Sequence, residues 1–108
     1  DIGDIVLKSV AKISLEGVRE HDTVVRWGGE EFIVLLPETT LEGAIQVAEK
    51  LRFNIENYTN EDIPRKFTAS FGVTTLIVND DEDSLIKRAD KALYDAKKSG
   101  KNTVRTNI

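Results

Sequence analysis

A pair of glycines between two strand-like runs constrains the fold of this chain more than any other feature of its sequence. Residues 24–27 and 32–36 are rich in β-branched, aromatic and aliphatic side chains, and Gly28 and Gly29 lie between them. Glycines in this position indicate a β-hairpin with a tight turn. Because such a turn carries few Cβ atoms, the phosphates or the base of a ligand can come close to its backbone.

Two carboxylates, Glu30 and Glu31, follow these glycines. Neighbouring residues on a strand point to opposite faces, so the two side chains are able to serve two different roles. Carboxylate oxygens are ligands that Mg²⁺ prefers, which makes the turn a candidate site for a metal ion and a phosphate. Exposed glutamates beside a glycine hairpin also commonly keep a turn soluble, and these residues alone leave both interpretations open.

The composition excludes several classes of protein. A chain of 108 residues is long enough to bury one hydrophobic core but not two, so we expect a single domain. The absence of cysteine excludes disulfides and thiolate metal sites and favours a cytoplasmic location. No apolar run approaches the roughly 20 residues of a membrane span, so we expect no membrane contact by this domain. The net charge of −4 argues against a surface for DNA or RNA.

Three segments carry apolar residues at helical spacing. The first runs from Asp4 to about Glu16, and Asp4 is placed to cap its first turn. The second follows residues 39–42, which have the form of a capping box. The third follows the acidic run 80–83, which complements a helix N-terminus, and ends where Gly100 offers a C-cap.

The remaining apolar segments have strand composition. Residues 67–71 and 73–78 are separated by Gly72, which indicates a bulge or kink, and a short strand is expected at 103–105. The order of elements predicts an α+β fold in which helices cover a mostly antiparallel sheet. Because residues 32–36 are apolar on both faces, we expect this strand inside the sheet rather than at its edge.

Three segments resemble the diguanylate cyclase family, the GGDEF domains. Residues 26–32 (RWGGEEF) resemble the family signature in its GGEEF form, and residues 88–102 (RADKALYDAKKSGKN) resemble the last helix of the family and the exit from it. Residues 67–73 (FTASFGV) resemble the strand that leads into a Gly-Val step. The resemblance covers essentially the whole chain, and it implies a ferredoxin-like, nucleotide-cyclase-like palm.

The resemblance implies an enzyme that condenses two GTP molecules into cyclic di-GMP and releases two pyrophosphates. In family members each domain of a dimer holds one GTP, and the 3′-hydroxyl of one GTP attacks the α-phosphate of the other. The implied partners are therefore GTP as substrate, cyclic di-GMP as product and inhibitor, and a second copy of the domain. A sensor domain on the N-terminal side is also implied, in a parent chain that other domains can anchor to a membrane.

The resemblance assigns roles to residues around the glycine turn. Gly28 and Gly29 match substrate-binding positions, and Glu30 matches the signature carboxylate that binds Mg²⁺ or Mn²⁺. Glu31 matches the next signature position, where a carboxylate orients or deprotonates the attacking hydroxyl. Asp4 matches an acidic residue that recognises guanine; the same residue type is an ordinary helix N-cap, and the two roles are compatible.

Two lysines near the C-terminus match the cations that hold the triphosphate. They are Lys97 and Lys101, four residues apart. The family more often carries arginine at the second position, so Lys101 supplies a point charge without a bidentate fork, and weaker binding of phosphate is implied. The alternative role for both lysines is to offset the dipole at the C-terminus of the helix.

Arg19 and Asp22 form an Arg-x-x-Asp pair that resembles the product-inhibition site of the family. Arginine can bond the O6 and N7 edge of guanine in a fork, and aspartate can accept from its N1 and N2. A surface ion pair would have the same sequence and would be the usual interpretation in an arbitrary protein. Five residues lie between the pair and Gly28, and this spacing from the signature favours the product-inhibition site.

The resemblance is incomplete at the N-terminus. In the family, a strand with a metal-binding aspartate and a helix with a guanine-binding asparagine precede the segment that matches residues 1–4, and no residues of this chain match them. We therefore interpret residues 1–108 as one GGDEF-like domain fragment that lacks the first strand and helix. The expected consequences are an inactive fragment, an active parent protein, and dimerisation, strand exchange or low stability of the fragment.

Two other functions compete with the enzyme. One is a non-catalytic module that senses GTP or cyclic di-GMP through its Arg-x-x-Asp pair, and the other is a structural or oligomerisation domain without a ligand. The carboxylates Glu30 and Glu31 favour the enzyme, because a retired domain has no need to keep them. The basic residues Lys97 and Lys101 in an acidic chain make a domain without a ligand less attractive.

Overall fold

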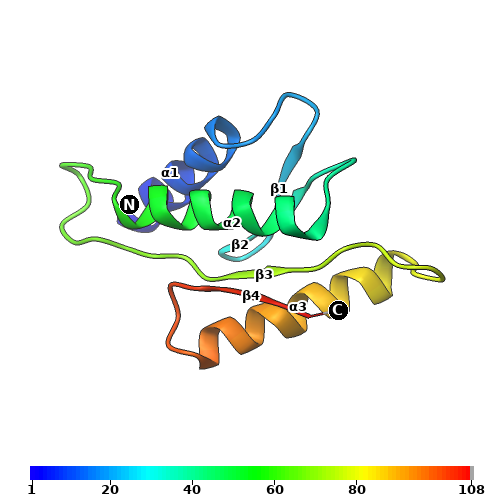
Figure 1. Ribbon diagram of the computed structural model, residues 1–108. Helices are drawn as coiled ribbons and strands as arrows, with labels where there is room; N and C mark the ends of the chain where they lie inside the picture. Colours follow the sequence, from blue (N-terminus) through cyan, green and yellow to red (C-terminus); the bar gives the residue numbers. More distant parts are fainter. Residues whose placement is uncertain (108) are drawn as a thin grey trace.

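The computed structural model describes residues 1–107, which form an α+β fold of the expected class (Figure 1). The elements in chain order are α1 (Ile2–Glu16), β1 (Thr23–Gly28), β2 (Glu31–Leu35), α2 (Leu41–Glu56), β3 (Phe71–Val73), α3 (Glu82–Lys98) and β4 (Val104–Thr106). Figure 1 shows β3 and β4 between α2 on one side and α3 on the other, with α1 beyond α2 and the β1–β2 hairpin crossing behind α2. None of the helices described is long and apolar enough to cross a membrane.

Helix α1 begins two residues earlier than its sequence pattern indicated. The side chain of Asp1 accepts a hydrogen bond from the backbone N–H of Asp4 at 2.9 Å, so Asp1 is the N-cap. The expectation that Asp4 caps this helix is therefore wrong, because a cap precedes the first turn and Asp4 lies inside it. The carboxylate of Asp4 remains exposed beside the N-terminal end of α1.

Helix α2 is capped by Thr40, whose side chain accepts from the backbone N–H of Gly43 at 3.1 Å. The cap is one residue later than the capping box at 39–42 indicated, since Gly43 now stands at the third helical position and has no side chain to complete a box. The apolar stripe of α2 packs inward as expected. Its buried residues are Ala48, Leu51 and Ile55.

Helix α3 follows the acidic run as expected. Asp81 is its N-cap and forms a reciprocal capping box with Ser84. Beyond the last turn Gly100 has a φ of 106°, the left-handed conformation that commonly follows a helix, and the N–H of Lys101 donates to the carbonyl oxygen of Ala96 at 3.1 Å. The prediction that Gly100 ends this helix is confirmed.

The β1–β2 hairpin is antiparallel, with Gly28 opposite Glu31 and a bulge between Arg26 and Gly28. Gly28 therefore ends the first strand, and the turn consists of Gly29 and Glu30. The hairpin is confirmed, and its turn lies one residue later than a Gly-Gly turn would.

Strands β3 and β4 pair in parallel, and α3 makes the crossover between them. A Cβ built on Gly72 would lie 2.3 Å from the backbone nitrogen of Leu93 and 2.4 Å from the carbonyl oxygen of Ala89, so glycine lets α3 pack directly on β3. The expected bulge at Gly72 is wrong, because the strand runs through it. Residues 67–70 and 74–78, expected as strands, lie outside any strand.

The four strands form two separate pairs rather than one sheet. β2 pairs only with β1, and within residues 1–107 no strand lies on its other edge. The expectation that β2 lies inside the sheet is therefore wrong for the residues described. The expected antiparallel pairing holds for the hairpin, whereas β3 and β4 are parallel because a helix connects them.

The core lies where the three helices and β3 approach one another. Its buried apolar residues are Ile13, Ala48, Leu51, Ile55, Ala92 and Ala96. Gly17 lets the end of α1 close onto α2, since a Cβ there would lie 2.4 Å from Cδ2 of Leu51. The small side chains of Ala92 and Ala96 likewise let α3 approach the sheet closely.

Candidate active site

The turn of the β1–β2 hairpin is uncovered. Apart from the residues next to each glycine in sequence, a Cβ built on Gly28 or Gly29 would meet no atom of residues 1–107 within 4 Å. Gly29 needs its positive φ of 52°, whereas packing within the described chain gives no reason for glycine at position 28. Arg26 braces the turn, because its Nε and Nη2 both donate to the carbonyl oxygen of Gly29, at 3.0 and 2.7 Å. The result is a braced backbone surface that a ligand can approach closely.

The two carboxylates of the turn have different surroundings. Glu30 lies at the tip and is exposed. Glu31 begins β2, and its Oε2 lies 4.0 Å from Nζ of Lys97 on the last turn of α3. Both side chains of this ion pair are about half exposed, at 45% and 47%. The fold thus brings together the predicted catalytic carboxylate Glu31 and the predicted triphosphate lysine Lys97, although most of the domain separates them in sequence.

Lys101 lies beyond α3 in an unusual stretch of backbone. Gly100, Lys101 and Asn102 have φ values of 106°, 63° and 47°, so three consecutive residues are left-handed. The side chain of Lys101 is exposed, and no ion pair involves it within residues 1–107. It remains available to an anion, while Lys97 already faces a carboxylate.

Asp4, the predicted guanine-binding residue, lies in the first turn of α1. Its side chain is 71% exposed, and its carboxylate lies 4.0 Å from the N-terminal amino group. No hydrogen bond or ion pair connects Asp4 to the hairpin turn within the described part of the chain. The structure therefore keeps this carboxylate accessible without joining it to Glu30 or Glu31.

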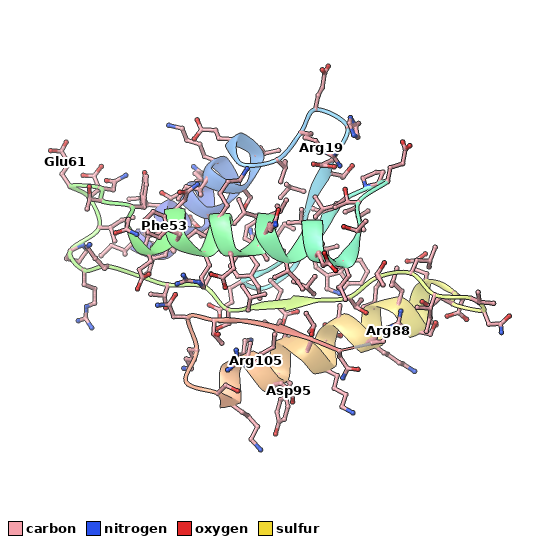
Figure 2. All side chains as sticks on the ribbon, viewed as in Figure 1. Arg19, Phe53, Glu61, Arg88, Asp95 and Arg105 are labelled. Carbon is pink, nitrogen blue, oxygen red and sulfur yellow. The ribbon has the colours of Figure 1, made fainter. Side chains whose placement is uncertain are left out.

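Arg19 and Asp22 form the ion pair that their spacing indicated, between α1 and β1. Figure 2 shows Arg19 on this loop. Asp22 Oδ2 accepts from the backbone N–H of Arg19 at 2.8 Å and from its Nε at 3.4 Å. Only 2% of the Asp22 side chain is exposed, against 54% of the Arg19 side chain. Burial alone would raise the pKa of Asp22, but the hydrogen bonds and charge of Arg19 lower this pKa below its ordinary value.

Arg19 also connects this loop to the segment that leads into α2. Its Nη2 donates to Oγ1 of Thr39 at 2.6 Å and to the carbonyl oxygen of Pro37 at 3.2 Å. The guanidinium is therefore held in place from two sides while half of the side chain stays exposed. Almost none of the Asp22 side chain beside it is exposed.

The candidate site consists of the uncovered glycine turn, its two carboxylates and the lysine that meets one of them. The family described as "Diguanylate cyclase, GGDEF domain" matches residues 1–103. The chain belongs to this family. The family predicted from residues 26–32 and 88–102 is confirmed.

Curated relatives are similar to this GGDEF domain over nearly its whole length. Diguanylate cyclase DgcM of Escherichia coli strain K12 is 44% identical over 102 residues, which cover 94% of this chain and 25% of that protein. The response regulator PleD of Caulobacter vibrioides is 39% identical over 111 residues, which cover 96% of this chain and 24% of that protein. The domain thus spans about a quarter of the length of these relatives.

Solved structures share the fold. The active GGEEF domain of a diguanylate cyclase from Vibrio cholerae has a TM-score of 0.83 and 29% identity, over 97% of this chain and 68% of that one. Diguanylate cyclase SiaD of Pseudomonas aeruginosa, solved in complex with its activator SiaC, has a TM-score of 0.87 and 37% identity, over 95% of this chain and 40% of that one. The α+β architecture described above is therefore that of a GGDEF domain.

Glu30 is the residue of this GGDEF domain that was predicted to bind a metal ion. No group of three His, Cys, Asp or Glu side chains in residues 1–107 is placed to hold a metal ion. Mg²⁺ is commonly bound through one or two carboxylates, with waters and substrate phosphates completing its octahedron. The exposed carboxylate of Glu30 at an uncovered turn fits this mode of binding, in which ligand and protein share the ion.

Several residues that contact the candidate site residues or their neighbours were missed from sequence. Arg26 lies within the signature, yet its role as a brace of the turn was not anticipated. Arg52 and Glu56 of α2 contact Asn102 beside Lys101. The i,i+4 spacing of Arg52 and Glu56 is visible in sequence and indicates a helical ion pair, but their contact with Asn102 depends on the tertiary fold.

Proposed function

We propose that this domain is the catalytic domain of a diguanylate cyclase, which condenses two GTP molecules into cyclic di-GMP. In each step the 3′-oxygen of one GTP forms a bond to the α-phosphorus of the other, and pyrophosphate leaves; two such steps close the ring. The observation that carries this proposal is the approach of Lys97 to Glu31 beside the uncovered glycine turn. Membership of the GGDEF family supports it.

The turn supplies the groups that act on the reacting atoms. Glu30 would hold Mg²⁺ or Mn²⁺, which when bound neutralises charge on the triphosphate. Glu31 accepts the proton of the attacking 3′-hydroxyl or orients that hydroxyl, since its carboxylate lies within the site and is half exposed. Without Cβ atoms, Gly28 and Gly29 let the nucleotide lie against the backbone of the turn.

The cations and the guanine contact lie on other elements. Lys97 and Lys101 bind the triphosphate, and the ion pair of Lys97 with Glu31 holds this lysine at the turn before nucleotide arrives. Asp4 accepts hydrogen bonds from the N1 and N2 groups of guanine with its exposed carboxylate. Product inhibition is assigned to Arg19, which bonds the O6 and N7 edge of guanine, while the buried Asp22 orients the guanidinium rather than touching the product.

The complete domain is proposed to contain one more strand between β2 and β3. The open edge of β2 and the separation of the two strand pairs support this, because β2 is apolar on both faces and strands of that kind lie inside sheets. A residue of that strand would complete the metal site, so residues 1–108 by themselves would have little or no cyclase activity. In the full-length protein the domain would act as a homodimer in the cytoplasm, under control of an N-terminal sensor domain.

The test is GTP turnover by the full-length protein with Mg²⁺, followed as cyclic di-GMP and pyrophosphate. Substituting Glu30→Ala or Glu31→Ala should abolish turnover, and Glu61→Ala, an exposed glutamate on the loop after α2 (Figure 2), is the matched control. Turnover that survives Glu30→Ala would contradict the proposal. A sensor module, the alternative, would bind cyclic di-GMP through Arg19 without any GTP turnover in the full-length protein.

A further inference from the structure

The turn between α3 and β4 contains two residues other than glycine in the left-handed conformation. Lys101 and Asn102 have φ values of 63° and 47°, directly after Gly100 at 106°. The left-handed conformation is unfavourable for residues other than glycine, and asparagine tolerates it better than most. Such conformations persist only where the surroundings over-determine them, and they cluster at functional sites. Contacts must therefore hold Lys101 where it is.

The supporting contacts come from α2. Nδ2 of Asn102 donates to Glu56 Oε2 at 2.8 Å, and Nη1 of Arg52 donates to Asn102 Oδ1 at 3.1 Å. Arg52 Nη1 also donates to Glu56 Oε1 at 3.2 Å, which closes a ring of three side chains. We call these three residues, Arg52, Glu56 and Asn102, the Asn102 clamp. Figure 1 shows the orange-to-red turn after α3 on the same side of the molecule as the C-terminal half of α2.

The charged groups of the clamp stabilise one another. The side chain of Arg52 is only 18% exposed and also contacts Glu49 at 3.3 Å. The hydrogen bond from Asn102, followed by that from Arg52, lowers the pKa of the Glu56 carboxyl below its ordinary value. The clamp therefore keeps its charges at neutral pH, and the amide of Asn102 satisfies both an anionic and a cationic partner at once.

We propose that the Asn102 clamp positions Lys101 for binding of the triphosphate, an inference that rests on the proposed function. Lys97 belongs to a regular helix turn, so its place is set by α3 itself. Lys101 lies beyond that helix, and the direction of its side chain depends on the backbone at 100–102. Arg52, Glu56 and Asn102 are thus positioning residues that act through Lys101.

The same corner also contributes to the fold. The backbone N–H of Asn102 donates to Oγ of Ser70 at 3.1 Å, and the N–H of Phe71 donates to the carbonyl oxygen of Thr103 at 2.9 Å, where β3 and β4 begin to pair. Loss of the clamp is therefore expected to reduce stability as well. A test of positioning has to separate the two effects.

The experiment is a double-mutant cycle on GTP turnover by the full-length protein with Mg²⁺. Asn102→Gly removes the clamp side chain while glycine still adopts the positive φ, and Lys101→Ala removes the cation. Asn79→Gly is the matched control, since Asn79 also has a positive φ, of 72°, and is exposed. Urea unfolding of each variant records stability separately.

Asn102→Gly is expected to raise the KM for GTP about 5-fold and Lys101→Ala about 10-fold, with kcat changed less than about 2-fold, because uniform binding is lost. The double variant should match Lys101→Ala, and Asn79→Gly should match the unaltered protein. Equal effects of Asn102→Gly in both backgrounds, or lowered stability without a change in KM, would overturn the inference alone. Absence of GTP turnover and GTP binding in the unaltered protein would overturn the proposed function and this inference together.

Discussion

Arg88 and Asp80 form a doubly hydrogen-bonded ion pair that fastens the loop before α3 to the helix. Nη1 and Nη2 of Arg88 donate to the two carboxylate oxygens of Asp80 at 2.9 and 2.5 Å, and only 4% of the Asp80 side chain is exposed. Nε of Arg88 donates to Thr74 Oγ1 at 2.8 Å, and its Nη2 donates also to the carbonyl oxygen of Thr75 at 2.6 Å. This arginine (Figure 2) organises a loop that has no strand structure of its own.

The Arg88–Asp80 pair makes the stability of the domain depend on pH. The hydrogen bonds from Arg88, together with that from the Ile77 N–H, hold the pKa of Asp80 well below its ordinary value of 3.8. A lowered carboxyl pKa contributes stability that is present above the ordinary pKa and is lost as the pH falls below it. We expect Asp80→Asn to lower the urea midpoint at pH 7 and to flatten the loss of stability between about pH 4 and pH 2.

Chemical denaturation across that pH range checks this prediction. Asp83→Asn serves as the control, because Asp83 is an exposed residue in the first turn of α3. An Asp80→Asn variant that keeps both the midpoint and the acid dependence of the unaltered protein would show that the ion pair is not a source of stability.

Alanine substitution should affect stability at Gly72 and GTP affinity at Gly28. Gly72→Ala would place a Cβ 2.3 Å from the backbone of α3, which cannot move aside cheaply, so we expect a loss of about 3 kcal/mol or more. A Cβ at position 28 would contact no atom of the described chain beyond its sequence neighbours. The free energy of unfolding of Gly28→Ala should therefore differ by less than about 0.5 kcal/mol from that of the unaltered protein. Affinity for GTP, measured by titration calorimetry, should nevertheless fall in Gly28→Ala. Unchanged affinity there would contradict a nucleotide at the turn.

Lys97 should act through its charge at the hairpin turn. Lys97→Ala is expected to raise the KM for GTP about 10-fold, because a charge-assisted contact to phosphate is lost. The KM of this variant should also depend less on salt than the KM of the unaltered protein. Steady-state kinetics at low and high salt provide the measurement. Lys91→Ala, an exposed lysine on the same helix, is the control. Equal changes in the two variants would argue for a general effect of net charge.

Arg19 and Asp22 should differ in how they affect inhibition by cyclic di-GMP. Arg19→Ala removes the group proposed to contact guanine, so the inhibition constant should rise at least about 10-fold. Asp22→Asn should produce a smaller increase together with lower stability, because it removes one acceptor of a buried carboxylate that orients the arginine. Inhibition curves for both variants, with Arg65→Ala as an exposed control, separate contact from orientation. A larger effect in Asp22→Asn would reverse the assigned roles.

Local sequence was sufficient for the helices and the hairpin. The amphipathic stripe of α2, the acidic cap of α3 and the glycines of the turn all act within a few residues, so their signals can be read in one dimension. The family signature was readable for the same reason, since its carboxylates and glycines are contiguous. Even here the ends shifted, and Asp1 rather than Asp4 caps α1.

Contacts between distant segments could not be read in this way. The strand continues through Gly72 because α3 packs against it. The sequence near residue 72 does not indicate which helix packs there. Arg52, Glu56 and Asn102 meet only because α2 and the turn after α3 fold against each other. The accessibility of Arg19 against the burial of Asp22 likewise depends on how a loop packs on the segment before α2. Short-range pattern specifies the elements and their chemistry, whereas long-range packing decides which side chains meet, because that choice depends on the relative free energies of whole arrangements.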